Sequence, residues 1–199
     1  MNPFKLIDSA NSEDEILLRF KEHPEKIRYC INQLAKNGET LIMKACKRSR
    51  PKVLEFLLNN FNCVWDINYQ TITAVAHRNE HIANFSPLMY ATYYDAPECF
   101  QILLKHNPNN IDIYKEDYRR YSPFKMIISS PSDFFIKELL KNDHYYEKIK
   151  EKINNLFTTA MCNASPQILL TILENFKDII IINENEEDSS ESVHHLFNI

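Results

Sequence analysis

Two adjacent bulky aliphatic residues recur at a fixed distance behind a short helical segment at four places in this 199-residue chain. In each copy they stand 12 and 13 residues after the last residue of that segment: Leu57-Leu58 after Ala45, Leu103-Leu104 after Ala91, Leu139-Leu140 after Ile127, and Ile172-Leu173 after Ala160. A unit of this size cannot bury its apolar face alone. Repetition in one register therefore predicts stacked units that share a continuous core.

Two other residue types keep the same register. A hydroxyl residue that can cap a helix precedes the segment in three copies: Thr40, Ser86 and Ser122. A proline follows the alanine by six residues in three copies: Pro51, Pro97 and Pro166. A proline there can open a second helix, because the first-turn N–H has no intrahelical partner. The pattern predicts pairs of short helices that approach closely at the small alanines.

These positions resemble the ankyrin repeat, whose signature is T-P-L-H-x-A in a unit of about 33 residues. Pro87 and Pro123 stand at the second position, and bulky apolar residues stand at the third: Ile42, Leu88, Phe124 and Phe157. The resemblance covers roughly residues 37–182, although the signature His is missing and Ile127 replaces the alanine in the third copy. It implies an all-α solenoid of stacked helix-turn-helix units with hairpin loops.

The resemblance divides the chain into three parts. Residues 1–36 lack the signature but contain a capping box from Ser12 to Glu15, followed by Pro24, so we expect an N-terminal helical cap. The repeat domain spans 37–182, with units at about 37–63, 84–107, 120–143 and 153–182 and an insertion at 64–83. Residues 183–199 contain five acidic residues and no Lys or Arg, which is typical of a disordered acidic tail.

The chain contains a single glycine, Gly38. P-loops, dinucleotide-binding fingerprints and nucleophile elbows all need glycine where backbone approaches a ligand, so the sequence excludes these enzyme sites. Ankyrin units normally turn through glycine. We therefore expect asparagines near the helix ends to adopt the left-handed conformation in its place: Asn60, Asn107, Asn142 and Asn175.

Charge and hydropathy exclude further classes. The net charge is −4, and without the acidic tail the chain is close to neutral, which argues against a nucleic-acid-binding protein with an extended basic face. No signal peptide or apolar run of about 20 residues is evident, so we expect no membrane span. The five cysteines form no C-x-x-C pair, which favours a reducing, cytoplasmic compartment.

Candidate chemistry is sparse. His77, Glu80 and His81 form an H-x-x-E-H spacing that could place two imidazoles on one helix face for a metal, but it falls in the insertion, and we favour a polar loop. Cys46 follows Ala45 on a packed helix and is expected to be a buried structural thiol. We therefore predict no catalytic residue, no metal and no cofactor.

Binding is better supported, because a solenoid exposes a long concave surface. Resemblance to ankyrin proteins implies partner contacts on the exposed face of each first helix: Lys44, Lys47, Arg48, Tyr90, Tyr93, Tyr94 and Lys125. Tyrosines flanked by cations suit a protein interface. One or two of the tyrosines could instead pack between repeats.

Two long connections supply further candidates. Residues 64–69 and 71–76 have strand-like composition, so the insertion could form a hairpin finger that carries Trp65 and Tyr69. Residues 114–121 could form a second finger, with Tyr114, Tyr118 and Arg119 as partner contacts. Both segments could instead be loops whose aromatic residues cover the edge of the solenoid.

The sequence thus predicts a non-enzymatic, monomeric module that binds a protein partner of unknown identity. An alternative is an enzyme or enzyme-associated protein with a site in residues 64–85, and a tetratricopeptide array is disfavoured because the W-x2-L-G pattern is absent. The abundance of Asn, Lys and Ile resembles low-GC genomes, and short divergent ankyrin proteins occur in intracellular bacteria and large viruses. This suggests an effector that acts in the cytoplasm of a host cell.

Overall fold

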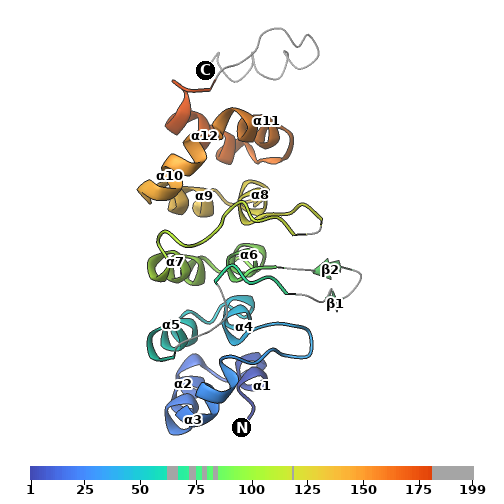
Figure 1. Cartoon of the computed structure of the whole chain (residues 1–199), viewed down its shortest axis with the longest axis vertical. Helices are drawn as coiled ribbons and strands as arrows, with labels where there is room; N and C mark the ends of the chain where they lie inside the picture. The colour runs from blue at the N-terminus through green and yellow to red at the C-terminus, as the bar shows by residue number, and fades with distance from the viewer. Residues whose placement is uncertain (62–66, 72–74, 78–79, 83–84, 118, 181–199) are drawn as a thin grey trace.

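Two rows of helices run side by side along the molecule (Figure 1). The computed structural model describes residues 1–61, 67–71, 75–77, 80–82, 85–117 and 119–180. What we call the inner row contains α1 (Pro3–Asp8), α4 (Leu41–Lys47), α6 (Pro87–Tyr93) and α8 (Pro123–Ile128). The outer row contains α2 (Glu13–Glu22), α5 (Pro51–Asn60), α7 (Pro97–His106) and α9 (Phe134–Leu140). The predicted all-α repeat solenoid is confirmed.

Further elements complete the chain. Helix α3 (Pro24–Cys30) contacts α1 and α2 at the N-terminal end, while α11 (Ile153–Asn163) and α12 (Pro166–Phe176) form a last pair in which α12 packs on α9. Helix α10 (Asp143–Lys150), which the sequence pattern did not predict, connects α9 to α11. In the part of the chain that the structure describes, no helix is long and apolar enough to cross a membrane.

The predicted helix caps are present on the inner row. The hydroxyls of Thr40, Ser86 and Ser122 accept hydrogen bonds from the backbone N–H three residues on, at 3.1, 3.4 and 3.2 Å. Prolines open α5, α7 and α12 as the spacing predicts. The fourth copy differs. Asn155 stands two residues before Phe157, where the register places a cap residue, but α11 begins at Ile153 and Asn155 lies inside the helix, so it does not cap it.

The recurring aliphatic pairs lie at the seam between neighbouring units. The first residue of each pair is almost completely buried: Leu57, Leu103, Leu139 and Ile172. Ala45 and Ala91 are fully buried between the two rows, where a larger side chain would separate the helices. The thiol of Cys46 is also fully buried, in agreement with its predicted structural role. Burial and the neighbouring Cys99 raise the pKa of this thiol.

The N-terminal region pairs differently from the prediction. The capping box from Ser12 to Glu15 is present on α2, but the partner of α2 in the repeat stack is α1, which the sequence pattern missed. Helix α1 packs on α4 and α2 packs on α5, so these two helices form a repeat-like unit and α3 is additional. The missed signal was Asn2-Pro3-Phe4-Lys5, which parallels Ser122-Pro123-Phe124-Lys125. The Asn2 side chain caps α1 by accepting from Lys5 N at 3.3 Å.

The prediction that asparagines adopt the left-handed conformation is wrong. Positive φ angles occur instead at Gly38, Ser49, Asp95 and Arg120, with φ of 77°, 47°, 49° and 63°. These positions repeat in register, since Gly38 and Arg120 precede a cap residue by two, and Ser49 and Asp95 follow one by nine. The asparagine side chains instead donate to backbone carbonyls, as Asn60 does to Phe56 O at 2.8 Å and Asn175 to Thr171 O at 2.7 Å.

The insertion contains a short antiparallel hairpin. Strands β1 (Val75–His77) and β2 (Glu80–Ile82) pair with Val75 opposite Ile82 and His77 opposite Glu80. The hairpin projects from the inner-row side (Figure 1). It pairs the end of the predicted second strand, residues 75–77, with residues 80–82. Residues 62–66, which include Trp65, lie outside the described residues, as does the predicted acidic tail.

Candidate protein-binding surface

Equivalent positions of α4 and α6 carry different chemistry. Counting from the cap residues, Lys44, Lys47 and Arg48 of α4 correspond to Tyr90, Tyr93 and Tyr94 at the end of α6. Because α4 packs directly on α6, the repeat register places a cationic group beside an aromatic group. All six residues were predicted to contact a partner, but their exposures differ widely.

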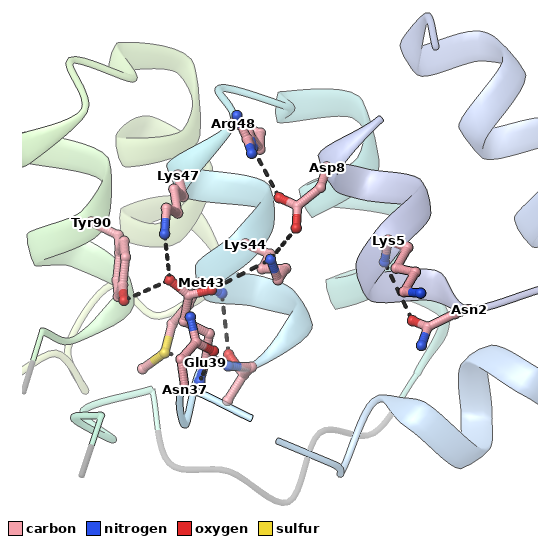
Figure 2. Close-up of polar contacts among 11 residues, drawn as sticks. Asn2, Lys5, Asp8, Asn37, Glu39, Met43, Lys44, Lys47, Arg48 and Tyr90 are labelled. Atoms are coloured by element: carbon pink, nitrogen blue, oxygen red, sulfur yellow. Dashed lines mark hydrogen bonds and ion pairs between the residues drawn. The ribbon is translucent and has the colours of Figure 1, made fainter. Parts of the chain in front are cut away.

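Glu39 organises the cationic side of this surface, and the sequence pattern did not single it out. Its side chain is fully buried next to the cap residue Thr40. Lys47 Nζ lies 2.8 Å from Glu39 Oε1, and the Tyr90 hydroxyl donates to the same oxygen at 3.0 Å (Figure 2). Lys44 Nζ lies 3.5 Å from Oε2. Three donors from two helices therefore converge on one buried carboxylate.

The pKa of Glu39 reflects this environment. Burial by itself would raise the pKa, but hydrogen bonds from Lys47 and Asn37 and the charges of Lys47 and Lys44 outweigh burial and leave the pKa below its ordinary value. The opposite holds for Tyr90, because burial and the neighbouring Glu39 carboxylate raise the pKa of its hydroxyl. Glu39 is therefore ionised and Tyr90 is neutral at physiological pH.

A second carboxylate, Asp8 at the end of α1, extends the network toward the N-terminal end. It pairs with Lys44, and its Oδ1 accepts from Arg48 Nε at 2.9 Å (Figure 2). Burial opposes ionisation of Asp8, but the hydrogen bonds and charges of Lys44 and Arg48 lower its pKa below the ordinary value. Asp8, like Glu39, was not among the predicted site residues, because nothing near it in sequence pairs with it.

The network decides which predicted residues face solvent. The Lys44 and Lys47 side chains are only 11% and 12% exposed, and Tyr90 is fully buried, so none of the three has the exposed position that the sequence predicted. Arg48 remains half exposed. Lys44, Lys47 and Tyr90 are covered where one repeat stacks on the next, because all three bind the buried carboxylate of Glu39.

An aromatic cluster continues the surface on α6. Tyr90 and Tyr94 stack with ring centroids 5.9 Å apart and an interplanar angle of 8°, and Tyr93 meets Tyr94 edge-on at 5.1 Å. Phe85, which precedes Ser86 and is buried, supports the Tyr93 ring at 5.5 Å. Tyr93 is 42% exposed and Tyr94 is half-buried. Lys47 Nζ lies 5.8 Å from the Tyr94 ring centroid, within range of a cation–π contact.

We define the inner-row surface as Arg48, Tyr93 and Tyr94, the predicted residues of α4 and α6 that keep side-chain area exposed. Arg48 is held by Asp8, and the two tyrosines are held by aromatic contacts. Side chains fixed in this way lose little conformational entropy on binding. Tyr and Arg are also the residue types that most often dominate binding energy at protein interfaces.

Two of the predicted finger residues, Tyr69 and Tyr114, make contacts of their own. The Tyr69 hydroxyl donates to Gly38 O at 3.4 Å, which ties the insertion to the preceding loop, and burial raises its pKa. The Tyr114 hydroxyl donates to Lys148 O at 3.2 Å, and Lys152 Nζ lies 4.3 Å from its ring centroid. Burial also raises the pKa of Tyr114. Tyr69 and Tyr114 thus cover edges of the solenoid.

The second finger is a closed loop. Asp117 Oδ1 accepts from the backbone N–H groups of Arg119 and Tyr121 at 2.8 Å each. Lys125 Nζ pairs with Glu116 at 2.6 Å, Arg119 is exposed, and Tyr118 lies outside the described residues. Tyr121, which the sequence reasoning did not select, is 51% exposed on this loop. Its position directly before the cap residue Ser122 corresponds to that of Glu39 before Thr40.

Metal chemistry finds no support in the described residues. His77 and Glu80 lie opposite each other in a strand pair, so the helical spacing on which the metal hypothesis depended does not exist. No group of three His, Cys, Asp or Glu side chains within the described part of the chain could hold a metal ion. The alternative enzyme site in residues 64–85 falls partly on residues outside that part.

Comparison with known proteins agrees with this geometry. The family model described as ankyrin repeats (3 copies) matches residues 7–117. The match begins within α1, before the predicted start at residue 37, as expected if α1 and α2 form a repeat-like unit. A search of curated proteins found no match.

Proposed function

The chain belongs to the ankyrin-repeat family, and from this premise we propose that its inner-row surface, formed by Arg48, Tyr93 and Tyr94, binds a partner protein. Ankyrin repeats are generally protein–protein interaction modules and are typically not enzymes. The observation that carries the proposal is the 42% exposure of Tyr93 on a ring supported by Phe85 and Tyr94. An aromatic side chain held rigid and half exposed contributes contact area at low entropic cost.

The charge arrangement supports the same residues. Lys44 and Lys47 are nearly buried and pair with Glu39, and Lys44 also pairs with Asp8, so Arg48 is the cation of this network that stays half exposed. Its partner Asp8 is 29% exposed. A partner group that accepts hydrogen bonds can therefore compete for the guanidinium without disturbing the buried carboxylate. We expect the contact to be moderate in strength and sensitive to salt.

Affinity capture with three versions of the full chain tests the proposal. The wild type, the Arg48→Ala/Tyr93→Ala double variant, and Leu18→Ala serve as baits in cytosol from host and non-host cells. Leu18→Ala is the matched control, because Leu18 is 58% exposed on the outer helix α2. A protein bound by the wild type and by Leu18→Ala, and lost from the double variant, supports the proposal. If every captured protein binds all three baits equally, the inner-row surface is not the binding site.

We further propose that the protein acts in the cytoplasm of a host cell. The proposal is supported by the composition, by the cysteine pattern and by its family. Its test is the source of the captured partner. Capture that depends on Arg48 and Tyr93 from host cytosol alone supports an effector role, and equal capture from unrelated cytosols contradicts it.

A further inference from the structure

A groove of about 770 Å³ lies at the N-terminal end of the stack, between α1, α3 and residues 33–37. Its apolar lining includes Phe4, Tyr29, Cys30 and Leu34. Tyr29 is 71% exposed, the largest exposure among the large apolar and aromatic side chains of the described residues. The groove is distinct from the inner-row surface, since none of Arg48, Tyr93 and Tyr94 lines it.

The rim of this groove carries more positive than negative charge. Lys5, Lys26 and Lys36 all line it, and all three are exposed. Two carboxylates also line it, but Asp8 is engaged by Lys44 and Arg48, as Figure 2 shows. The other, Glu25, lies 3.7 Å from His23. Within the described residues no acidic side chain forms an ion pair with any of the three lysines.

We propose that this N-terminal groove binds an acidic peptide segment that carries an apolar anchor residue and belongs to a partner protein. The lysines attract the acidic residues, and the lining of Phe4, Tyr29 and Leu34 receives the anchor. A volume of this size falls within the range of roughly 300–1,000 Å³ typical of ligand sites. The groove is open to solvent, which suits a chain segment better than a small molecule that must be enclosed.

This second site goes beyond the proposed function, because it lies at the end of the stack and selects a different chemistry. Attraction between exposed charges is screened by salt within about 10 Å at 0.1 M ionic strength, so binding should weaken as salt rises. The apolar anchor should supply the part of the affinity that salt does not remove.

Selection from a random peptide display library tests the proposal, with the full chain as bait. We expect the enriched peptides to combine at least two Asp or Glu residues with one aromatic or aliphatic residue. The best peptide is then synthesised with a fluorescent label, and its affinity is measured by anisotropy against the wild type and two groove variants, Lys5→Glu/Lys36→Glu and Tyr29→Ala. We expect each variant to bind about tenfold more weakly, a loss of about 1.4 kcal/mol.

Two controls make the outcome decisive. Tyr93→Ala, which leaves the Arg48–Asp8 pair intact, should bind the peptide like the wild type, and this separates the groove from the inner-row surface. Unchanged thermal melting of the groove variants shows that the fold is intact, as expected because all three substituted side chains are exposed. Absence of enrichment, enrichment of neutral or basic peptides, or equal binding by the groove variants overturns the proposal. Self-association of the chain that Lys5→Glu/Lys36→Glu abolishes also overturns it, because a second copy is then the occupant.

Discussion

The hydroxyl of Tyr90 donates a hydrogen bond to Glu39 Oε1, with 3.0 Å between the two oxygen atoms. Glu39 precedes α4 and Tyr90 lies on α6, so the bond joins neighbouring repeats, and both side chains are fully buried. Lys47, which binds the same carboxylate oxygen, also lies 5.8 Å from the Tyr94 ring centroid. Lys47 therefore connects the buried network to Tyr94 of the inner-row surface.

The first prediction concerns this bond. Tyr90→Phe should lower the free energy of unfolding by about 1.5–3 kcal/mol, because a buried hydrogen bond to a charged group is lost. Urea denaturation at pH 7 measures the loss. Tyr69→Phe is the control, since its hydroxyl meets the neutral carbonyl of Gly38 at 3.4 Å and is half-buried, and a loss of about 0.5–1 kcal/mol is expected. Equal losses in the two variants would contradict the central role of Glu39.

The second prediction concerns acid stability. Glu39 and Asp8 have folded-state pKa values below their ordinary 4.5 and 3.8, so their contribution to stability is complete above these values and is lost as pH falls through the folded pKa values. The wild type should therefore lose stability steeply below about pH 4.5. Glu39→Gln should be less stable by about 3 kcal/mol at pH 7, because Lys47 loses its buried partner.

Melting curves measured across the acid range check this prediction. Glu39→Gln should show a shallower decline with acidification than the wild type, because one of the two titrating groups is gone. Glu55→Gln on the outer helix α5 is the control, and its decline should match that of the wild type. If the stability of the wild type and that of Glu39→Gln fall in parallel as the pH is lowered, protonation of Glu39 is not a cause of the acid sensitivity.

The third prediction compares two cap positions of the repeat register. Ser122→Ala should destabilise the protein by about 1 kcal/mol, because the Lys125 N–H loses its capping acceptor. Asn155→Ala should cost nothing or stabilise slightly, because Asn155 is exposed inside α11 and alanine is the better helix former. Chemical denaturation of the two variants measures both effects. If Asn155→Ala loses more stability than Ser122→Ala, Asn155 caps a helix and the fourth unit begins at the position that the sequence register gives.

The fourth prediction concerns the left-handed residue Arg120, whose φ is 63°. Arg120→Gly should raise the free energy of unfolding by up to about 1 kcal/mol, because glycine adopts this conformation without the steric cost. Arg120→Ala keeps the Cβ atom and should give no gain. Thermal melting distinguishes the two variants, and a gain shared by both would attribute the effect to the lost charge.

Most of the fold could be predicted from local sequence patterns. The cap residues Thr40, Ser86 and Ser122, together with the prolines that open α5, α7 and α12, act within one helical turn, so they can be read without a structure. The sequence pattern did not predict helix α1, because this helix is only six residues long and is capped by Asn2 in place of the Ser or Thr that caps α4, α6 and α8. The prediction that asparagines take the left-handed conformation was wrong. Which residue of a turn has a positive φ depends on how the two helices of a unit pack against each other, and that packing is not visible in the sequence.

The candidate site was predictable only in outline. The sequence by itself determined the repeat register, which places Lys44, Lys47 and Arg48 opposite Tyr90, Tyr93 and Tyr94, because that register is a matter of spacing along the chain. Tertiary structure alone decided which of these side chains reach solvent. Glu39 lies far from Tyr90 in sequence, and only the stacking of α6 on α4 brings its carboxylate to Tyr90, whereas Lys47 belongs to the same unit as Glu39. A buried charge must be paired, so this contact draws Lys44, Lys47 and Tyr90 inward and leaves Arg48 and Tyr93 exposed.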